Sequence, residues 1–186
     1  MSEQPGRPAG TGRKRVNTRR AIREIVEMVL VAVVFAFLVR GFVVETFVVL
    51  GPSMEPTLHD LERLFVNKLV YRLQGPEHGD IIVFAYPRDP SRDFIKRVIG
   101  LPGQTVEIQD GRVYIDGEFI VENYISFPDP NGNYGEVEVP EAHVFVMGDN
   151  RRNSEDSRFF GFVPYSNIRG KAFLIYWPIN RFGLPR

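Results

Sequence analysis

Hydrophobic and polar positions follow two different patterns along the chain, and the pattern changes near residue 45. Before that point, residues 28–39 are uncharged and strongly apolar. After it, short runs of Val, Ile, Phe and Tyr alternate with turn residues, as in DIIVFAY, QTVEI, HVFVMG and KAFLIYW. The first pattern predicts one apolar helix, and the second predicts a mainly β fold.

Turn signals separate the predicted strands. Asp-Gly pairs at residues 110–111 and 116–117 flank the run VYI, which is typical of tight hairpins. Helical periodicity is absent after residue 45, so we expect an antiparallel coiled-sheet or barrel-like domain, with a small hairpin-rich insertion over residues 104–140. The stretch RLFVNKLVY, residues 63–71, is predicted as a further β-type run.

The apolar run before residue 45 allows three interpretations. Its twelve uncharged residues would form a helix of about 18 Å, shorter than a hydrocarbon core of about 30 Å, which favours a buried helix. If the span is extended to residues 24–44, Glu27 and Arg40 fall near opposite interfaces, as in a transmembrane anchor. A basic segment before an apolar run is also typical of a cleavable export signal, but no small-x-small cleavage pattern follows the run. An uncleaved anchor fits these observations best.

Charge is distributed unevenly, although the formal net charge is zero. Residues 1–24 hold seven Lys or Arg and two Glu, so the rest carries 16 of the 23 basic and 21 of the 23 acidic residues. This asymmetry predicts a cytoplasmic basic tail over residues 1–23 and an extracytoplasmic domain over residues 45–186. We therefore expect a single-pass protein of the plasma membrane that contacts membrane lipid and does not bind nucleic acid.

Composition narrows the chemistry. The chain has no cysteine, which excludes disulfides and thiolate metal sites. The three histidines, His59, His78 and His143, are isolated, and the acidic residues lack the spacing of metal ligands. We therefore expect neither a metal nor a cofactor.

Three segments contain candidate chemistry. Ser53 lies in GPSMEPTL, where glycine and two prolines predict an irregular backbone that exposes its hydroxyl. Lys96 interrupts the apolar run that begins FIKRVIG, and strand alternation places it on the face of Phe94 and Val98. The polar loop GDNRRNSEDSR, residues 148–158, is dense enough in charge to predict an ion pair within it. Taken singly, each segment also fits an ordinary turn, a surface lysine or a solvated loop.

Together these segments resemble the bacterial type I signal peptidases. SMEPTL, KRVIGLPG and GDNRRNSEDSR follow one another in the order of that family, and the resemblance covers about residues 20–178. It implies an all-β catalytic domain after an N-terminal membrane anchor. It also implies a serine endopeptidase that removes signal peptides from exported preproteins, after small residues at positions −1 and −3.

The resemblance assigns roles to individual residues. It implies that Ser53 is the nucleophile, that Lys96 is its general base, and that Ser154 hydrogen-bonds the lysine. It further implies a structural ion pair between Asp156 and Arg158. The residues expected to line the substrate pockets are Phe47, Val49, Met54 and Ile95.

The oxyanion donors depart from one pattern within that family. Some members carry a hydroxyl residue two positions before the nucleophile, and this chain has Gly51 there. Pro52 has no backbone N–H, so the donors are expected to be other backbone N–H groups, including that of Ser53. Lys96 must also be buried without a contacting carboxylate, because its reference pKa of about 10.4 has to fall by about 3 units for it to be neutral.

Other functions remain open from the residues alone. A Ser-His-Asp hydrolase would use one of the histidines, but none lies in a segment that would position it. A repressor-type Ser-Lys autoprotease would carry a DNA-binding helical region in place of the apolar run. A non-catalytic, membrane-tethered β module that binds peptides would need neither Ser53 nor a lysine with a lowered pKa.

Overall fold

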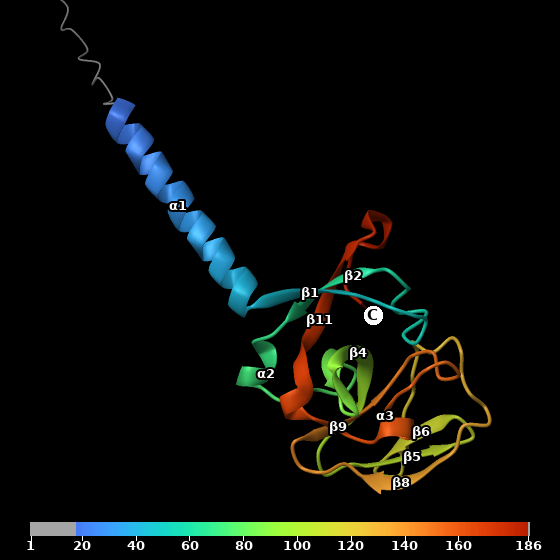
Figure 1. Cartoon of the computed structure of the whole chain (residues 1–186). Helices are drawn as coiled ribbons and strands as arrows, with labels where there is room; N and C mark the ends of the chain where they lie inside the picture. Colours follow the sequence, from blue (N-terminus) through green and yellow to red (C-terminus); the bar gives the residue numbers. More distant parts are fainter. Residues whose placement is uncertain (1–17, 186) are drawn as a thin grey trace, which may run out of the picture. The chain divides into compact units, whose positions relative to one another are not determined.

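The computed structural model describes residues 18–185, and the chain divides between Leu38 and Val39 into two compact units. The prediction of a basic tail falls mostly on residues 1–17, which lie outside the described residues. The first described element is α1, Thr18–Phe42 (Figure 1). Within the described residues before residue 45, a helix is thus present where the sequence predicts one.

Helix α1 has 25 residues, and every described side chain from residue 22 to residue 36 is exposed. Arg23 and Glu27, one turn apart on this helix, form an ion pair with 2.8 Å between Nε and Oε1. Among the described residues, no helix combines the length and the apolar character that a membrane span needs.

Antiparallel β-sheet dominates the second unit. A seven-stranded sheet has the order β1-β2-β11-β3-β4-β9-β10. Its strands are β1 Val44–Val48, β2 Arg63–Asn67, β3 Ile81–Tyr86, β4 Asp89–Gly100, β9 His143–Met147, β10 Val163–Pro164 and β11 Ile168–Trp177. The predicted antiparallel β fold is therefore confirmed. Within the described part of the chain, the edge strands β1 and β10 do not pair with each other, so the sheet does not close into a barrel.

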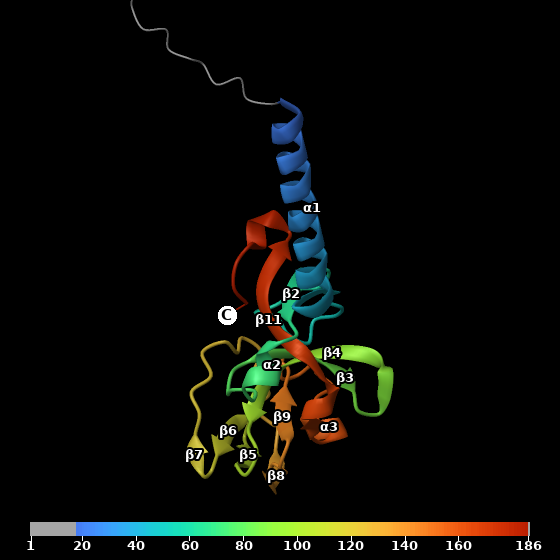
Figure 2. The same ribbon diagram turned by 90° about the vertical axis from the view of Figure 1, so that its left-hand side faces the viewer.

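A smaller sheet has the order β7-β6-β5-β8 and lies beside β9, away from β1 and β2 (Figures 1 and 2). Its strands are β5 Thr105–Gln109, β6 Arg112–Ile115, β7 Glu118–Phe119 and β8 Tyr134–Glu138. The two predicted Asp-Gly hairpins are confirmed, since Asp110 and Asp116 adopt φ of 48° and 53° before their glycines.

Short helices connect the strands: α2 Val70–Leu73, α3 Ser157–Phe160, and the 3₁₀ turns η1 Tyr165–Asn167 and η2 Ile179–Arg181. The prediction of one β-type run over residues 63–71 was wrong after Asn67. The side chain of Asn67 accepts hydrogen bonds from the backbone N–H groups of Leu69 and Val70, which ends β2 and turns the chain into α2.

Strand β3 is the centre of the larger sheet, and all six of its residues are buried. Ile81 and Val83 pack into one hydrophobic cluster, whereas Ile82 and Phe84 pack into another on the opposite face. Because β4 pairs with β3 along most of its length, side chains of β4 are held against a core that is closed on both sides. Lys96 lies on β4, opposite Ile82.

Candidate active site

The loop after β1 presents Ser53. Gly51 adopts a φ of 84°, a conformation that glycine tolerates best, and its N–H donates to Asp60 Oδ1 at 2.7 Å. Beyond Ser53, the fully buried side chains of Met54 and Leu58 fix the loop to the core. The serine is thereby held half-buried on a loop with an anchored backbone.

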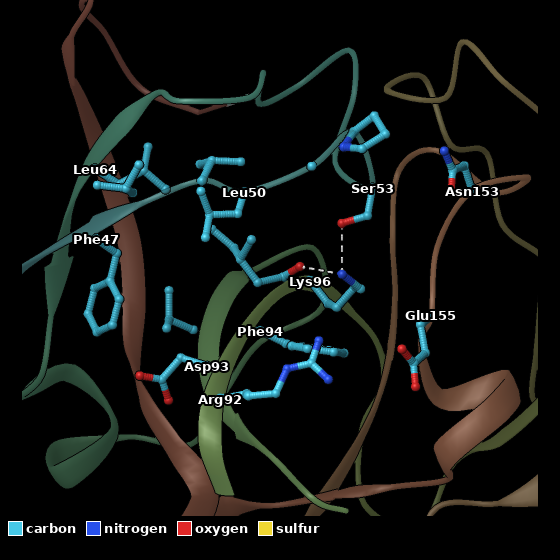
Figure 3. A pocket seen from close by; sticks show the side chains of 16 residues that line it. Phe47, Leu50, Ser53, Leu64, Arg92, Asp93, Phe94, Lys96, Asn153 and Glu155 are labelled. Atoms are coloured by element: carbon cyan, nitrogen blue, oxygen red, sulfur yellow. Dashed lines mark hydrogen bonds between the residues drawn. The ribbon is translucent and has the colours of Figure 1, made fainter. Parts of the chain in front are cut away.

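Lys96 reaches Ser53 from β4. Its Nζ lies 2.8 Å from Ser53 Oγ and 2.9 Å from the carbonyl oxygen of Ile95, and Figure 3 shows the two side chains pointing toward one another. The residue is only 4% exposed, and the ring of Phe94 lies 5.3 Å from Nζ. The fold thus brings together two residues that are 43 positions apart in the sequence.

The surroundings of Lys96 disfavour its charged form. Burial lowers the pKa of Lys96 to about 8, against the opposing effect of the negative charges of Asp156, Glu155 and Asp149. None of the described carboxylates forms an ion pair with its ammonium group. A substantial fraction of this lysine is therefore neutral near pH 7.5, and a neutral amine can accept a proton from Ser53.

Ser154 lies close to this pair but does not make the expected hydrogen bond to Lys96. Its Oγ is buried and has no hydrogen-bond partner among the described residues. A Cβ on Gly148 would collide with that oxygen and with the carbonyl oxygen of Ser53, so the absence of a side chain at Gly148 lets the two loops approach.

Asp156 and Arg158 form a bidentate ion pair, with 2.8 Å between Nε and Oδ1 and 2.9 Å between Nη2 and Oδ2. The Asp156 carboxylate is fully buried, and it also accepts from the backbone N–H groups of Gly148 and Arg158. Its bonds are thus to the two ends of the polar loop and not to Ser53 or Lys96.

A pocket of about 280 Å³ opens beside Ser53 and Lys96. Phe47, Val49 and Ile95 line it, as expected, but Met54 does not, because its side chain is fully buried in the core beneath the loop. The sequence placed Phe94 only on the face of Lys96, and it did not indicate the remaining lining side chains, which are Val48, Leu50, Pro52, Leu64, Val83, Arg92, Asp93, Asn153 and Glu155. Val83 is brought to the pocket by its pairing with Ile95 between β3 and β4, which the structure shows and the sequence does not.

Arg97, which sequence reasoning left without a role, lies on the face of β4 opposite to Lys96. Its guanidinium is 2.9 Å from Asp149 Oδ1 and 2.7 Å from Oδ2, and it also reaches Thr57 Oγ1 and the carbonyl oxygen of Gly79. Both residues of this pair are buried, so each charge depends on the other for compensation, and their separation of 52 positions leaves no local signal in the sequence.

Comparison with known proteins places this chain among peptidases. The family model described as "Signal peptidase, peptidase S26" matches residues 22–177. A probable signal peptidase I-2 of Synechocystis is 44% identical over 87% of this chain and 76% of its own length. Signal peptidase I of Leptolyngbya laminosa is 43% identical over 96% and 90%. A solved signal peptidase I from Enterococcus faecalis is 39% identical, covers 52% of this chain and 95% of its own, and has a TM-score of 0.46.

The chain therefore belongs to the signal peptidase family, peptidase S26. Its activity is that of a serine endopeptidase that removes signal peptides from exported preproteins. The resemblance seen in the three sequence segments is confirmed by these matches.

Proposed function

We propose that Ser53 and Lys96 form the catalytic dyad of this signal peptidase. The single observation that carries the proposal is the 2.8 Å separation between Lys96 Nζ and Ser53 Oγ at a lysine whose pKa burial lowers to about 8. Neutral Lys96 accepts the hydroxyl proton while Ser53 Oγ bonds to the scissile carbonyl carbon.

The same proton completes the reaction. Lys96 returns it to the amide nitrogen as the C–N bond breaks, which releases the mature protein and leaves the signal peptide esterified to Ser53. A water molecule then gives a proton to Lys96 and attacks the ester, and the lysine reprotonates Ser53 Oγ as the signal peptide leaves. We propose the backbone N–H of Ser53 as an oxyanion donor, because Gly51 supplies no hydroxyl and Pro52 no N–H.

Cleavage is proposed to follow small residues at positions −1 and −3. Val49 and Ile95 supply apolar walls directly beside the dyad, and Val49 is itself only 2% exposed. Val49 is part of a hydrophobic core cluster and the half-buried Ile95 packs against that cluster, so these walls should resist the displacement that a ring would require. A preprotein with Phe in place of Ala at −1 is expected to lose most of its kcat/KM, and equal cleavage of both substrates would count against these walls.

We further propose that α1 anchors the enzyme in the plasma membrane, with the basic tail in the cytoplasm and the β unit outside. Support comes from the exposure of its apolar side chains, including Val29, Val31 and Phe35, and from the excess of basic residues at the start of the chain. Protease added outside spheroplasts should digest the β unit. Its full protection would overturn this topology.

The dyad is tested with detergent-solubilised enzyme and a labelled preprotein. Ser53→Ala and Lys96→Arg should each abolish cleavage, because the first removes the nucleophile and the second installs a guanidinium with a pKa above about 12 that cannot act as a base. Lys68→Arg, a change at a more exposed lysine that pairs with Glu45, is the matched control and should cleave normally. A Lys96→Arg enzyme with near wild-type rate would end the Ser-Lys mechanism.

The non-catalytic binding module, which the residues alone left open, is contradicted by the match to signal peptidases. It predicts that the wild-type chain binds the preprotein without releasing a product. It also predicts that Ser53→Ala leaves both properties unchanged.

A further inference from the structure

A segment outside the seven-stranded sheet reaches the polar loop that borders the dyad. Residues 122–128, here called the strap, follow β7 and precede β8. Three contacts tie the strap to the loop. Arg151 Nη1 donates to Glu122 Oε2 at 2.8 Å, Arg152 Nε donates to the carbonyl oxygen of Pro128 at 2.8 Å, and Phe127 forms a parallel β-bridge with Asn150.

The loop residues held by the strap also hold the backbone around Ser53. The backbone N–H of Asn150 donates to the carbonyl oxygen of Ser53 at 3.1 Å, and its Nδ2 donates to the carbonyl oxygen of Pro52 at 3.2 Å. Arg151 Nε donates to the carbonyl oxygen of Gly148, which lies against Ser53. A single loop residue, Asn150, thus connects the strap to the backbone of Ser53.

The strap reaches the other half of the dyad through Tyr124. The Tyr124 ring lies 3.9 Å from the guanidinium carbon of Arg97, the residue next to Lys96 on β4. The Tyr124 hydroxyl donates to Glu122 Oε1 at 2.6 Å, so the two strap side chains form one unit. Burial and the charge of Glu122 raise the pKa of the Tyr124 phenol, which keeps it protonated as the donor of this bond.

Burial makes this network sensitive to the loss of either charge. The side chains of Arg151 and Glu122 are 2% and 6% exposed, so each charge depends on the other for compensation. On one side the strap contacts Asn150 and Arg151 of the polar loop beside Ser53, and on the other side it contacts Arg97, the neighbour of Lys96. No strap residue lines the substrate pocket.

We propose that Glu122 and Tyr124 are positioning residues of the peptidase reaction, which fix Ser53 relative to Lys96 through Asn150 and Arg151 on one side and Arg97 on the other. The inference rests on the proposed Ser-Lys dyad. Proton transfer and attack require the reacting atoms to be aligned, and a displacement of about 1 Å can cost about 100-fold in rate. Substrate binding should change less than kcat, because the apolar walls formed by Phe47, Val49 and Ile95 belong to β1, the residue just after it and β4, and none of the strap contacts described above is to them.

The test uses the full chain in detergent with a cleavable preprotein. Glu122→Gln keeps the shape of the side chain but removes the charge that compensates Arg151, and Tyr124→Phe removes only the phenol oxygen. We expect kcat to fall about tenfold in Glu122→Gln and about threefold in Tyr124→Phe, with KM unchanged within about twofold. Glu136→Gln, at an exposed glutamate of β8 in the same small sheet, is the matched control and should behave as wild type.

Folding and function are separated by two further measurements. Near-UV circular dichroism at the assay temperature reports the folded fraction, and kcat is expressed per folded molecule. Glu122→Gln is also combined with Asn150→Ala. If Glu122 acts through Asn150, the loss of kcat in the double variant should be smaller than the product of the single losses.

Wild-type kcat per folded molecule in both strap variants would overturn the proposal. So would strictly multiplicative losses in the double variant, or a loss that appears only as a raised KM. If Glu122→Gln does not fold, the kcat of Tyr124→Phe decides by itself. An active Lys96→Arg enzyme would instead overturn the dyad, whatever the strap variants do, so the two failures are distinguishable.

Discussion

The two faces of β4 place neighbouring cations in opposite environments. Lys96 and Arg97 are both buried, at 4% and 6% exposure. Among the described residues, the hydrogen-bond partners of Lys96 Nζ are the hydroxyl of Ser53 and the carbonyl oxygen of Ile95, and burial lowers the pKa of Lys96 to about 8. Arg97 is bound by both oxygens of the Asp149 carboxylate. Lys96 has no carboxylate in contact among the described residues, whereas Arg97 has one bound to its guanidinium.

This difference separates two uses of burial. A lysine deprived of a carboxylate loses its proton readily and becomes a base, at a cost to stability. An arginine bound to a buried carboxylate stays charged and joins the segments that carry its partners. Because Lys96 and Arg97 are adjacent, the ion pair of Arg97 with Asp149 also holds the backbone of the proposed base in place.

The largest effect on stability is expected on the face of Arg97. Asp149→Asn leaves a buried guanidinium without its counter-charge, which should lower the free energy of unfolding by about 3–5 kcal/mol. The control is Asp93→Asn, which breaks an exposed pair with Arg169 and should cost less than about 1 kcal/mol. Urea unfolding of both variants provides the measurement. Equal losses would mean that the Arg97 face is not a compensated buried pair.

A change of opposite sign is expected on the face of Lys96. Lys96→Met should stabilise the inactive enzyme by up to about 3 kcal/mol at pH 7, the equivalent of a pKa that falls from 10.5 to about 8 on folding.

The pH dependence provides a check on the sign. Below pH 8 the lysine is charged in both states and the full penalty applies, whereas above pH 10.5 it is neutral in both and the penalty is gone. The advantage of Lys96→Met should therefore shrink as the pH rises through this window. An advantage that is absent at pH 7, or that grows with pH, would contradict the account of Lys96.

Local patterns predicted the fold better than the details of the site. The Asp-Gly hairpins and the β character follow from neighbouring residues, and the three motifs indicated Ser53 and Lys96 through resemblance. Contacts between distant segments left no local signal. Arg97 and Asp149 are 52 positions apart and Arg151 and Glu122 are 29 apart, so no periodicity relates them. Met54 was misplaced because a loop residue beside the nucleophile faces the core instead of the pocket.

The smallest effect is expected from the one exposed carboxylate that influences Lys96. Of the charges that raise the pKa of Lys96, those of Asp156 and Asp149 are held in ion pairs, whereas Glu155 is exposed and accepts a hydrogen bond from the Tyr86 hydroxyl. Glu155→Gln removes a negative charge that favours the ammonium, so the pKa of Lys96 should fall further. The acid limb of kcat/KM should then move to lower pH, by less than about one unit, because Glu155 is exposed to solvent.

Ionic strength sharpens this prediction. An exposed charge is screened, so the displacement between wild type and Glu155→Gln should be largest at low salt and should nearly vanish at about 1 M salt, where the Debye length is about 3 Å. Glu141→Gln, a change at an exposed glutamate that does not contribute to the pKa of Lys96, should leave the profile in place. A displacement toward higher pH would show that the lost hydrogen bond to Tyr86 matters more than the lost charge. In that case the displacement of the acid limb could not be attributed to the effect of the Glu155 charge on the pKa of Lys96.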